Sequence, residues 1–203
     1  MTCPICLFTY KRLWHTKRCI KSLLKNPESA HTKLYIFSDA PKSEKDQEAV
    51  KQVRAYIRDI KGFAELEVIE QATNQGLAQS VIQGVSYLLK KYEGLIIVED
   101  DLEVSPSFLN YMNAGLLQYK DDPRVVSIHG YVYPCAQPLP AFFFLRGADC
   151  WGWATWPRAW ELFEQDGAVL KRKLLDQNLV RAFDFDRNYP FYKILEDQIK
   201  GLN

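Results

Sequence analysis

Three adjacent acidic residues, Glu99, Asp100 and Asp101, follow directly on the apolar run Leu95–Val98. If that run is a buried strand, its end brings three carboxylates to one point, where they repel one another. A divalent cation would neutralise them, and oxygen ligands suit Mg²⁺ or Mn²⁺. Such an ion stabilises negative charge on a departing phosphate. The alternative is a solvated acidic loop, or acids that precede a helix beginning near Ser105.

The elements that would position these acids form an alternating pattern. Short apolar runs alternate with longer segments of helical periodicity, which predicts an α/β fold with a mostly parallel sheet flanked by helices. Several runs are apolar at consecutive positions, as expected for strands covered on both faces. The predicted strands are Pro4–Thr9, Lys33–Phe37, Leu66–Ile69, Leu95–Val98, Val125–His129 and Phe142–Leu145.

Helical segments lie between and after these strands. Ser43, with Asp46 three residues later, is typical of a capping box. Ser105 and Pro106 predict the start of another helix, with Ser as the N-cap and Pro at the first helical position. The other predicted helices are Trp14–Lys25, Ser43–Ile60, Leu77–Tyr92, Lys171–Phe183 and Tyr189–Lys200. We expect one domain over residues 1–203.

Open α/β sheets bind ligands beyond the carboxyl ends of their strands. Arg12 would offer a planar fork to a phosphate there, and Gly76 would let the backbone approach a ligand at a helix N-terminus. Simpler alternatives are a solvated charge at Arg12, turn chemistry at Asp39 and a plain helix start at Gly76. The polar residues that this rule selects are Thr9, Tyr10, Lys11, Arg12, Ser38, Asp39, Asn74, Gln75, Gly76, Glu99, Asp100 and Asp101.

The continuous run from Val98 to Phe108 closely resembles the metal-binding segment of the N-acetylglucosaminyltransferase I family. In that family an acidic triplet stands for the DXD motif of GT-A glycosyltransferases. The resemblance implies a GT-A fold in which Asp101 ligates Mn²⁺ or Mg²⁺. It also implies that Asp100 and Glu99 lie against the sugar and ribose of a nucleotide-sugar donor.

Other strand ends are similar to glycosyltransferase segments in the same order. Thr9, Tyr10 and Arg12 resemble the first strand end, where a backbone turn and an Arg meet the nucleotide. Asp39 resembles the residue that hydrogen-bonds the nucleotide base. Asn74 and Gly76 resemble the turn of family-2-like glycosyltransferases that leads into a helix under the donor. The region lacks the basic-aromatic stretch with a His found in N-acetylglucosaminyltransferase I, so the donor sugar stays open.

A tryptophan-rich segment, Cys150–Trp156, follows the aromatic run Phe142–Leu145. It resembles the family's Gly-Trp loop, which borders the donor sugar and the acceptor. The resemblance implies sugar or acceptor contacts at Trp151, Gly152 and Trp153. The alternative places Trp153 and Trp156 in the core and leaves only Trp151 exposed. Asp149 is a weaker candidate for contact with acceptor hydroxyls.

The catalytic base is the least determined residue. In inverting relatives an acid near a Trp-containing helix activates the acceptor hydroxyl. Asp197 is the nearest candidate, and the alternative is an exposed acid on the last helix. Because related proteins continue beyond this point, we expect the domain to be truncated at its C-terminus.

The net charge, the apolar runs and the cysteines limit the kinds of partner and the cellular location to be expected. The 203 residues carry a formal net charge of +1, which gives no long-range attraction to nucleic acid. No apolar run reaches the ~20 residues needed to span a bilayer, and no signal peptide is recognisable. Cys3 and Cys6 read as buried thiols of a reducing compartment, so a cytoplasmic location is expected.

The combined expectation is an inverting, metal-dependent transfer from a UDP-sugar to a glycan or polysaccharide acceptor. Two alternatives stay open, a nucleotidyltransferase of related fold and a non-catalytic carbohydrate- or nucleotide-binding domain. The nucleotidyltransferase usually has a Gly-rich basic loop after the first strand, which Thr9–Arg12 lacks.

Overall fold

The computed structural model describes residues 2–202, which form two compact units. The first unit comprises Met1–Pro134 and Asp149–Glu161, and it contains the whole sheet. The second comprises Cys135–Ala148 and Leu162–Asn203. The expectation of one domain stays a prediction.

The first unit is built on a six-stranded sheet with the strand order β3-β2-β1-β4-β6-β5. The strands β1, β2, β3 and β4 are parallel, whereas β6 runs antiparallel to both β4 and β5. This arrangement confirms the predicted mostly parallel α/β sheet. The strands span Ile5–Thr9 (β1), Lys33–Ser38 (β2), Glu65–Glu70 (β3), Leu95–Glu99 (β4), Ile128–His129 (β5) and Trp153–Thr155 (β6).

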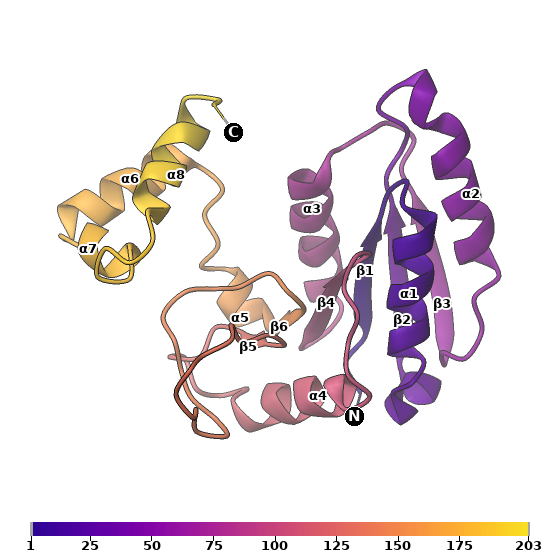
Figure 1. Ribbon diagram of the computed structural model, residues 1–203, viewed down its shortest axis with the longest axis horizontal. Coiled ribbons are helices and arrows are strands. Elements are labelled where there is room, and N and C mark those ends of the chain that lie inside the picture. The colour runs from indigo at the N-terminus through magenta and orange to yellow at the C-terminus, as the bar shows by residue number, and fades with distance from the viewer. Residues whose placement is uncertain (1, 203) are drawn as a thin grey trace. The chain divides into compact units, whose positions relative to one another are not determined.

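Helices cover both faces of this sheet, so the central strands are buried on each side. Figure 1 shows α3 on one face of the sheet and α1 and α2 on the other. The long helices are α1 (Leu13–Leu23), α2 (Gln47–Arg58), α3 (Leu77–Leu89) and α4 (Phe108–Gln118). Shorter turns are η1 (Pro27–His31), η2 (Glu44–Asp46) and α5 (Pro157–Trp160).

Alternate residues of β1 divide the core into two layers. Ile5 and Leu7 face the layer that includes residues of α1, α2 and α4, and Cys6 and Phe8 face the layer of α3. Gly84 allows α3 to lie close to the sheet, because a Cβ there would sit 2.8 Å from the Phe8 ring. The packing therefore fixes α3, whose first turn follows Gly76, against the strand that leads to Arg12.

The second unit is helical, with α6 (Gly167–Asp176), α7 (Val180–Phe183) and α8 (Phe191–Ile199). The Asp166 carboxylate caps α6 by accepting hydrogen bonds from the amides of Ala168 and Val169. Lys171 of α6 pairs with Glu196 of α8 at 2.8 Å. No helix within residues 2–202 has the length and apolar character to cross a membrane.

Several predicted elements are wrong in detail. The predicted strand Phe142–Leu145 is an exposed segment without strand pairing, because Trp153–Thr155 takes the place beside β4 instead. The predicted strand Val125–His129 shortens to β5. The predicted helix Lys171–Phe183 divides between α6 and α7, and the bounds of the other predicted helices shift by a few residues.

Two predicted helix starts are also wrong. The Ser105 carbonyl accepts hydrogen bonds from the Asn26 side chain and the Phe108 amide, so α4 begins after it, at Phe108. Ser43 hydrogen-bonds to the Asp46 carboxylate rather than capping a backbone amide, and a 3₁₀ turn precedes α2.

Candidate functional site

The order of the sheet defines one topological switch point, between β1 and β4. From β1 the chain extends the sheet through β2 and β3, and then returns to add β4 on the other side of β1. Open α/β sheets bind ligands in the crevice at such a point. The register pairs Phe8 with Glu99 and Thr9 with Ser38, so the strand ends lie level with one another.

Arg12 meets the acidic triplet at this switch point. Its Nη2 lies 2.5 Å from Asp100 Oδ1, and its Nη1 lies 3.1 Å from Asp101 Oδ2. The Asp100 residue is 3% exposed, whereas the side chains of Asp101 and Arg12 are 41% and 45% exposed. One guanidinium thus bridges a buried carboxylate and an accessible one.

One side of α1 anchors the acidic segment over its whole length. Near the triplet, Thr16 Oγ1 lies 3.5 Å from Asp100 Oδ2, and the Cys19 thiol faces the Glu99 carbonyl. Further along, Ser22 Oγ accepts a hydrogen bond from the Val104 amide at 3.0 Å. Asn26 then donates to the Ser105 carbonyl and accepts from the Leu109 amide. Spacing of three residues puts Thr16, Cys19 and Ser22 on one face of α1, and Asn26 lies just beyond the end of that helix.

Negative charge exceeds positive charge at the triplet. Burial raises the pKa of Glu99, and the Asp101 and Asp100 carboxylates raise it further. Burial also raises the pKa of Asp100, although the hydrogen bond from Arg12 opposes that rise. Three carboxylates face a single guanidinium, so a second cation would relieve their repulsion.

The carboxylates of the triplet fit a cation that is also coordinated by water or phosphate oxygens. Within residues 2–202 no group of three or more His, Cys, Asp or Glu side chains is arranged to enclose a metal. Mg²⁺ commonly binds through one or two carboxylates and completes its shell with water and phosphate oxygens. The accessible Asp101 oxygens match that mode, and the site does not match an all-protein cage.

Asp39 is the centre of a hydrogen-bond cluster between two strand ends. Its Oδ1 accepts from the amides of Ala40 at 2.8 Å and Gln75 at 2.9 Å. Its Oδ2 accepts from the Gly76 amide at 2.9 Å and the Asn74 side chain at 3.0 Å. Both carboxylate oxygens are therefore engaged within the protein, and a nucleotide base would have to share them. Sequence reasoning identified these residues without showing that they bind one another.

The same cluster shapes the turn that leads into α3. Gly76 has a φ of 75°, and a Cβ placed on it would meet nothing within 4 Å. That positive φ favours glycine, and the open space leaves room for a ligand near the first turn of α3. Asn74 also donates to the Ala40 carbonyl at 2.7 Å, so its amide is part of the turn's structure.

The predicted donor residues of the first strand end are held by their neighbours. Thr9 is buried, and its carbonyl accepts from the Asp39 amide at 3.0 Å. The Tyr10 hydroxyl donates to Asp46 at 3.0 Å and accepts from the Lys42 amide. Within residues 2–202, two members of this group reach the acidic triplet: the Arg12 guanidinium pairs with Asp100 and Asp101, and the Tyr10 backbone amide donates to Asp100.

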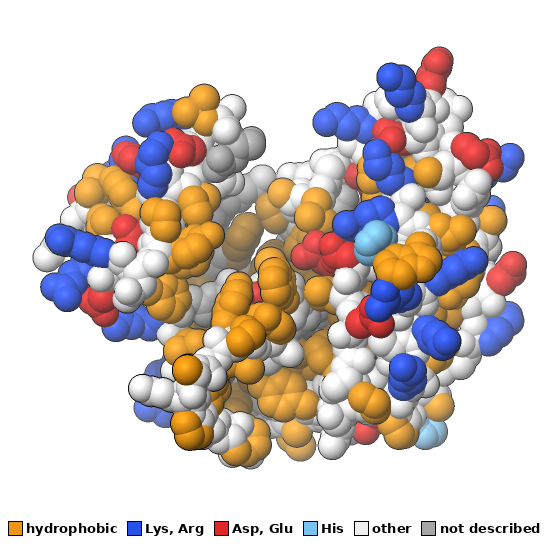
Figure 2. All heavy atoms as spheres, in the orientation of Figure 1, with side chains coloured by type: hydrophobic (Ala, Val, Ile, Leu, Met, Phe, Trp, Pro, Cys, Tyr) orange, Lys and Arg blue, Asp and Glu red, His pale blue; other side chains and the backbone are white. Residues whose placement is uncertain are grey.

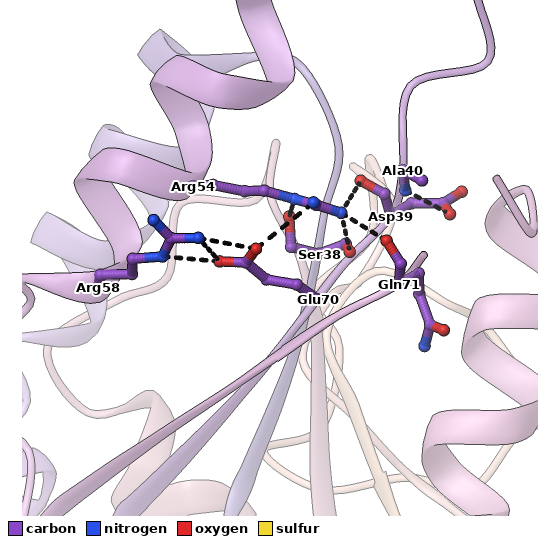
Figure 3. Close-up of polar contacts among 7 residues, drawn as sticks. All are labelled: Ser38, Asp39, Ala40, Arg54, Arg58, Glu70 and Gln71. Atoms are coloured by element: carbon purple, nitrogen blue, oxygen red, sulfur yellow. Dashed lines mark hydrogen bonds and ion pairs between the residues drawn. The ribbon is translucent and has the colours of Figure 1, made fainter. Parts of the chain in front are cut away.

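Arg54 supports this edge of the sheet and was not identified from the sequence. Figure 3 shows its guanidinium directed at the main chain that follows β2 and β3. It donates to the Gln71 carbonyl at 2.8 Å and to the Ser38 and Asp39 carbonyls at 3.3 Å. Glu70 pairs with both Arg54 and Arg58. The available signal in the sequence was the four-residue spacing of Arg54 and Arg58, which puts both arginines on one face of a predicted helix.

The tryptophan segment divides between surface and core. Trp151 is 46% exposed, whereas Trp153 lies on β6, partly buried, with its ring 6.0 Å from the Trp160 ring. Trp156 is buried and donates from Nε1 to the Leu116 carbonyl. Gly152 has a φ of 74°, and its carbonyl accepts from the Gly130 amide at 2.7 Å. Trp151 is thus the tryptophan of this segment with a large accessible ring.

Asp197, the candidate base, lies on α8 in the second unit. Its carboxylate forms an ion pair with Lys193, one helical turn earlier. Its catalytic role stays a prediction.

Comparisons with known proteins give structural likenesses only. Neither the protein-family models nor the curated proteins include a match to this sequence. TarS from S. aureus is 17% identical over 59% of this chain and 33% of its own, with a TM-score of 0.42. The mannosyltransferase PcManGT from Pyrobaculum calidifontis, in complex with GDP-Man and Mn²⁺, is 13% identical over 63% and 35%, with a TM-score of 0.41.

A third solved structure, the glycosyltransferase GlyE of Streptococcus pneumoniae TIGR4, is 15% identical with a TM-score of 0.37. It covers 87% of this chain and 38% of its own. The chain thus spans about a third of the length of the solved proteins that it resembles.

Proposed function

We propose that this chain is the donor-binding part of a GT-A, metal-dependent glycosyltransferase that uses a nucleotide-sugar. The observation that carries this proposal is the meeting of Arg12 with Asp100 and Asp101 at the switch point of the sheet. A diphosphate carries the charge that both a guanidinium and a carboxylate-bound cation attract. The resemblance of residues 98–108 to N-acetylglucosaminyltransferase I supports the same assignment.

The residues divide the work by their burial. Asp101 is accessible and would hold Mn²⁺ or Mg²⁺, which when bound stabilises negative charge on the leaving diphosphate. Asp100 is buried and holds the Arg12 fork in place. Glu99, half-buried beside them, would face the donor sugar or ribose.

The turn between Asn74 and Gly76 would support the donor from the side of α3. Asp39 fixes this turn through three hydrogen bonds, so its first contribution would be positional. The open space at Gly76 and the first turn of α3 would favour an anionic group of the donor. We also propose that Asp39 binds the nucleotide base. Its carboxylate oxygens would then accept a hydrogen bond from the base in addition to those from the protein.

The finer assignments are a UDP-sugar donor, a glycan or polysaccharide acceptor and inversion at the anomeric carbon. Asp197 is the proposed base for the acceptor hydroxyl, and Trp151 is the proposed contact with the sugar. The cytoplasm is the proposed location, supported by the free thiols Cys3, Cys6, Cys19, Cys135 and Cys150.

Release of nucleoside diphosphate tests this function. The chain is incubated with UDP- and GDP-sugars, with Mn²⁺ and with EDTA, and with glycan acceptors added or omitted. Release from one donor that needs Mn²⁺ and is lost in Asp101→Asn supports the proposal. Metal-dependent nucleotide binding without any release would favour the non-catalytic binding domain. Release of pyrophosphate from a nucleoside triphosphate and sugar phosphate would favour the nucleotidyltransferase.

A further inference from the structure

We infer that Tyr131, Tyr133 and Trp151 form an aromatic platform that binds a saccharide ring of the acceptor. This inference rests on the proposed function, because it assigns the acceptor side of the same site. Tyr131, Tyr133 and Trp151 are 40%, 60% and 46% exposed. Their ring centroids lie 4.7 to 5.8 Å apart. Hereafter these three residues are called the aromatic platform.

The backbone brings the platform residues together just beyond the paired ends of β5 and β6. In the antiparallel pair of β5 and β6, His129 lies opposite Trp153. One step further, the Gly130 amide donates to the Gly152 carbonyl at 2.7 Å, which brings Tyr131 opposite Trp151. The Tyr133 ring contacts the rings of both Tyr131 and Trp151, at centroid distances of 5.2 and 5.8 Å. The register of buried strands thus sets the spacing of exposed rings.

A second set of hydrogen bonds fixes the chain on the Trp151 side. The Asp149 amide donates to His129 Nδ1 at 3.1 Å, and the Trp151 amide donates to Asp149 Oδ1 at 3.0 Å. Burial lowers the pKa of His129, which favours the neutral ring that accepts this hydrogen bond. The platform is therefore held before any ligand arrives, which reduces the entropy lost on binding.

The chemistry of this surface matches a sugar rather than an apolar partner. Pyranose rings present C–H groups on their faces and hydroxyls around their edges. The platform offers ring faces for the former, and two phenol hydroxyls and the Asp149 carboxylate for the latter. Asp149 lies close enough to raise the pKa of the Tyr133 phenol. Tyr133 and Asp149 hydrogen-bond to each other, and the hydroxyls at the edge of a sugar ring can add to that hydrogen bond.

The platform also adjoins the acidic triplet. Leu102, directly after the triplet, lies 3.8 Å from the Cβ position of Gly152, next to Trp151. After burial, the nearby Glu99 and Asp149 carboxylates raise the pKa of the Cys150 thiol, and Asp101 adds to this effect. A saccharide on the platform would therefore lie beside the donor site. Figure 2 shows hydrophobic side chains gathered over the segment between β5 and β6.

The test is a saccharide array probed with the wild-type chain and its variants, each with UDP and Mn²⁺ present. The best-bound saccharide is then titrated, and saturation-transfer NMR identifies the sugar protons in contact. Tyr133→Ala and Trp151→Ala are expected to weaken binding about tenfold or more, because each removes a ring face. Tyr133→Phe keeps the ring and should retain most of the affinity. Saturation transfer should be strongest at ring C–H protons.

Tyr87→Ala is the matched control, because Tyr87 is an exposed tyrosine on α3, outside the platform. Circular dichroism melting checks that every variant is folded. Failure of the wild type to bind any saccharide, or equal binding by wild type and folded Tyr133→Ala, would overturn the platform. UDP binding in the same samples separates the two proposals. Retained Mn²⁺-dependent UDP binding with no role for the platform rejects this inference alone, whereas platform-dependent saccharide binding without nucleotide binding rejects the transferase.

Discussion

Arg12 bridges Asp100 and Asp101, with its two terminal nitrogens 2.5 and 3.1 Å from one carboxylate oxygen of each. The bridge links the first helix to the end of β4 and places a fixed positive charge where a diphosphate would bind. Because Asp100 is buried and Asp101 is accessible, disrupting their contacts should have different effects. Substitution of Asp101 should therefore lower the affinity for ligands. Substitution of Arg12, the partner of Asp100, should also lower the stability of the fold.

Replacing Arg12 tests the structural half of this relationship. Arg12→Met leaves the buried Asp100 carboxylate with Thr16 as its remaining side-chain partner, and should lower the free energy of unfolding by about 1–3 kcal/mol. Urea denaturation measures the change. Lys11→Met is the matched control, because the Lys11 side chain is as exposed as that of Arg12 and its partner Asp46 keeps hydrogen bonds from Tyr10 and Ser43, so the loss should be smaller. Equal effects of the two substitutions would show that the Asp100 pair adds no special stability.

Asp39→Asn tests whether the cluster at Asp39 holds the turn before α3. The amide nitrogen of Asn would face N–H donors from Gln75, Gly76 or Ala40, so at least one hydrogen bond is lost and one repulsion is gained. We expect a loss of about 2–4 kcal/mol in the free energy of unfolding.

Hydrogen exchange locates that effect. The amides of Gln75 and Gly76 should exchange faster in Asp39→Asn than in wild type, under conditions where the rest of the sheet stays protected. The exposed Asp59, at the end of α2, provides the control substitution Asp59→Asn. Unchanged exchange at Gln75 and Gly76 would mean that the turn does not depend on Asp39.

His129 predicts a pH dependence of stability. Burial lowers its pKa below the ordinary value of 6.5, even though Asp149 opposes the shift. The unfolded chain therefore binds a proton first as the pH falls, and the contribution of neutral His129 is present above about 6.5 and lost as the pH falls toward the folded pKa. Urea denaturation between pH 7.5 and 5, values that bracket the unperturbed histidine pKa of ~6.5, measures this change.

His129→Gln separates this titration from that of other groups. Glutamine does not titrate, so the variant should lose less stability than wild type as the pH falls through this window. His15→Gln, the same substitution at a histidine of α1, is the matched control for the loss of a histidine. Parallel pH profiles of wild type and His129→Gln would contradict the assignment of a neutral, buried His129.

The parallel strands could be predicted from the sequence because they are short and buried on both faces. Leu95–Val98 and Lys33–Phe37 differ from β4 and β2 by one residue at one end. The three-residue β6 was missed, because its strand character comes from pairing with β4 and β5 rather than from its own pattern. Phe142–Leu145 shows the opposite case, in which β-favouring residues find no partner strand.

The candidate site was predictable as a set of positions but not as a set of interactions. The carboxyl-end rule located Arg12, Asp39 and the acidic triplet, since parallel strands bring these residues to one edge. It could not show that Asp39 is occupied by amides 36 and 37 residues away, because that depends on how β2 and the turn before α3 meet. The alternation of Tyr131 and Tyr133 after His129 was a signal for the platform that went unused.

Titration of UDP by calorimetry tests the central claim most directly, with Mn²⁺, with EDTA, and with the Asp101→Asn variant. We predict binding with Mn²⁺ that weakens at least about tenfold on chelation or in Asp101→Asn, while the melting temperature of the variant stays close to that of wild type. GDP and ADP in the same buffer report base preference. UDP binding of equal strength with EDTA and in Asp101→Asn, or the failure of all three nucleotides to bind the folded chain, would contradict a metal–nucleotide site at the acidic triplet.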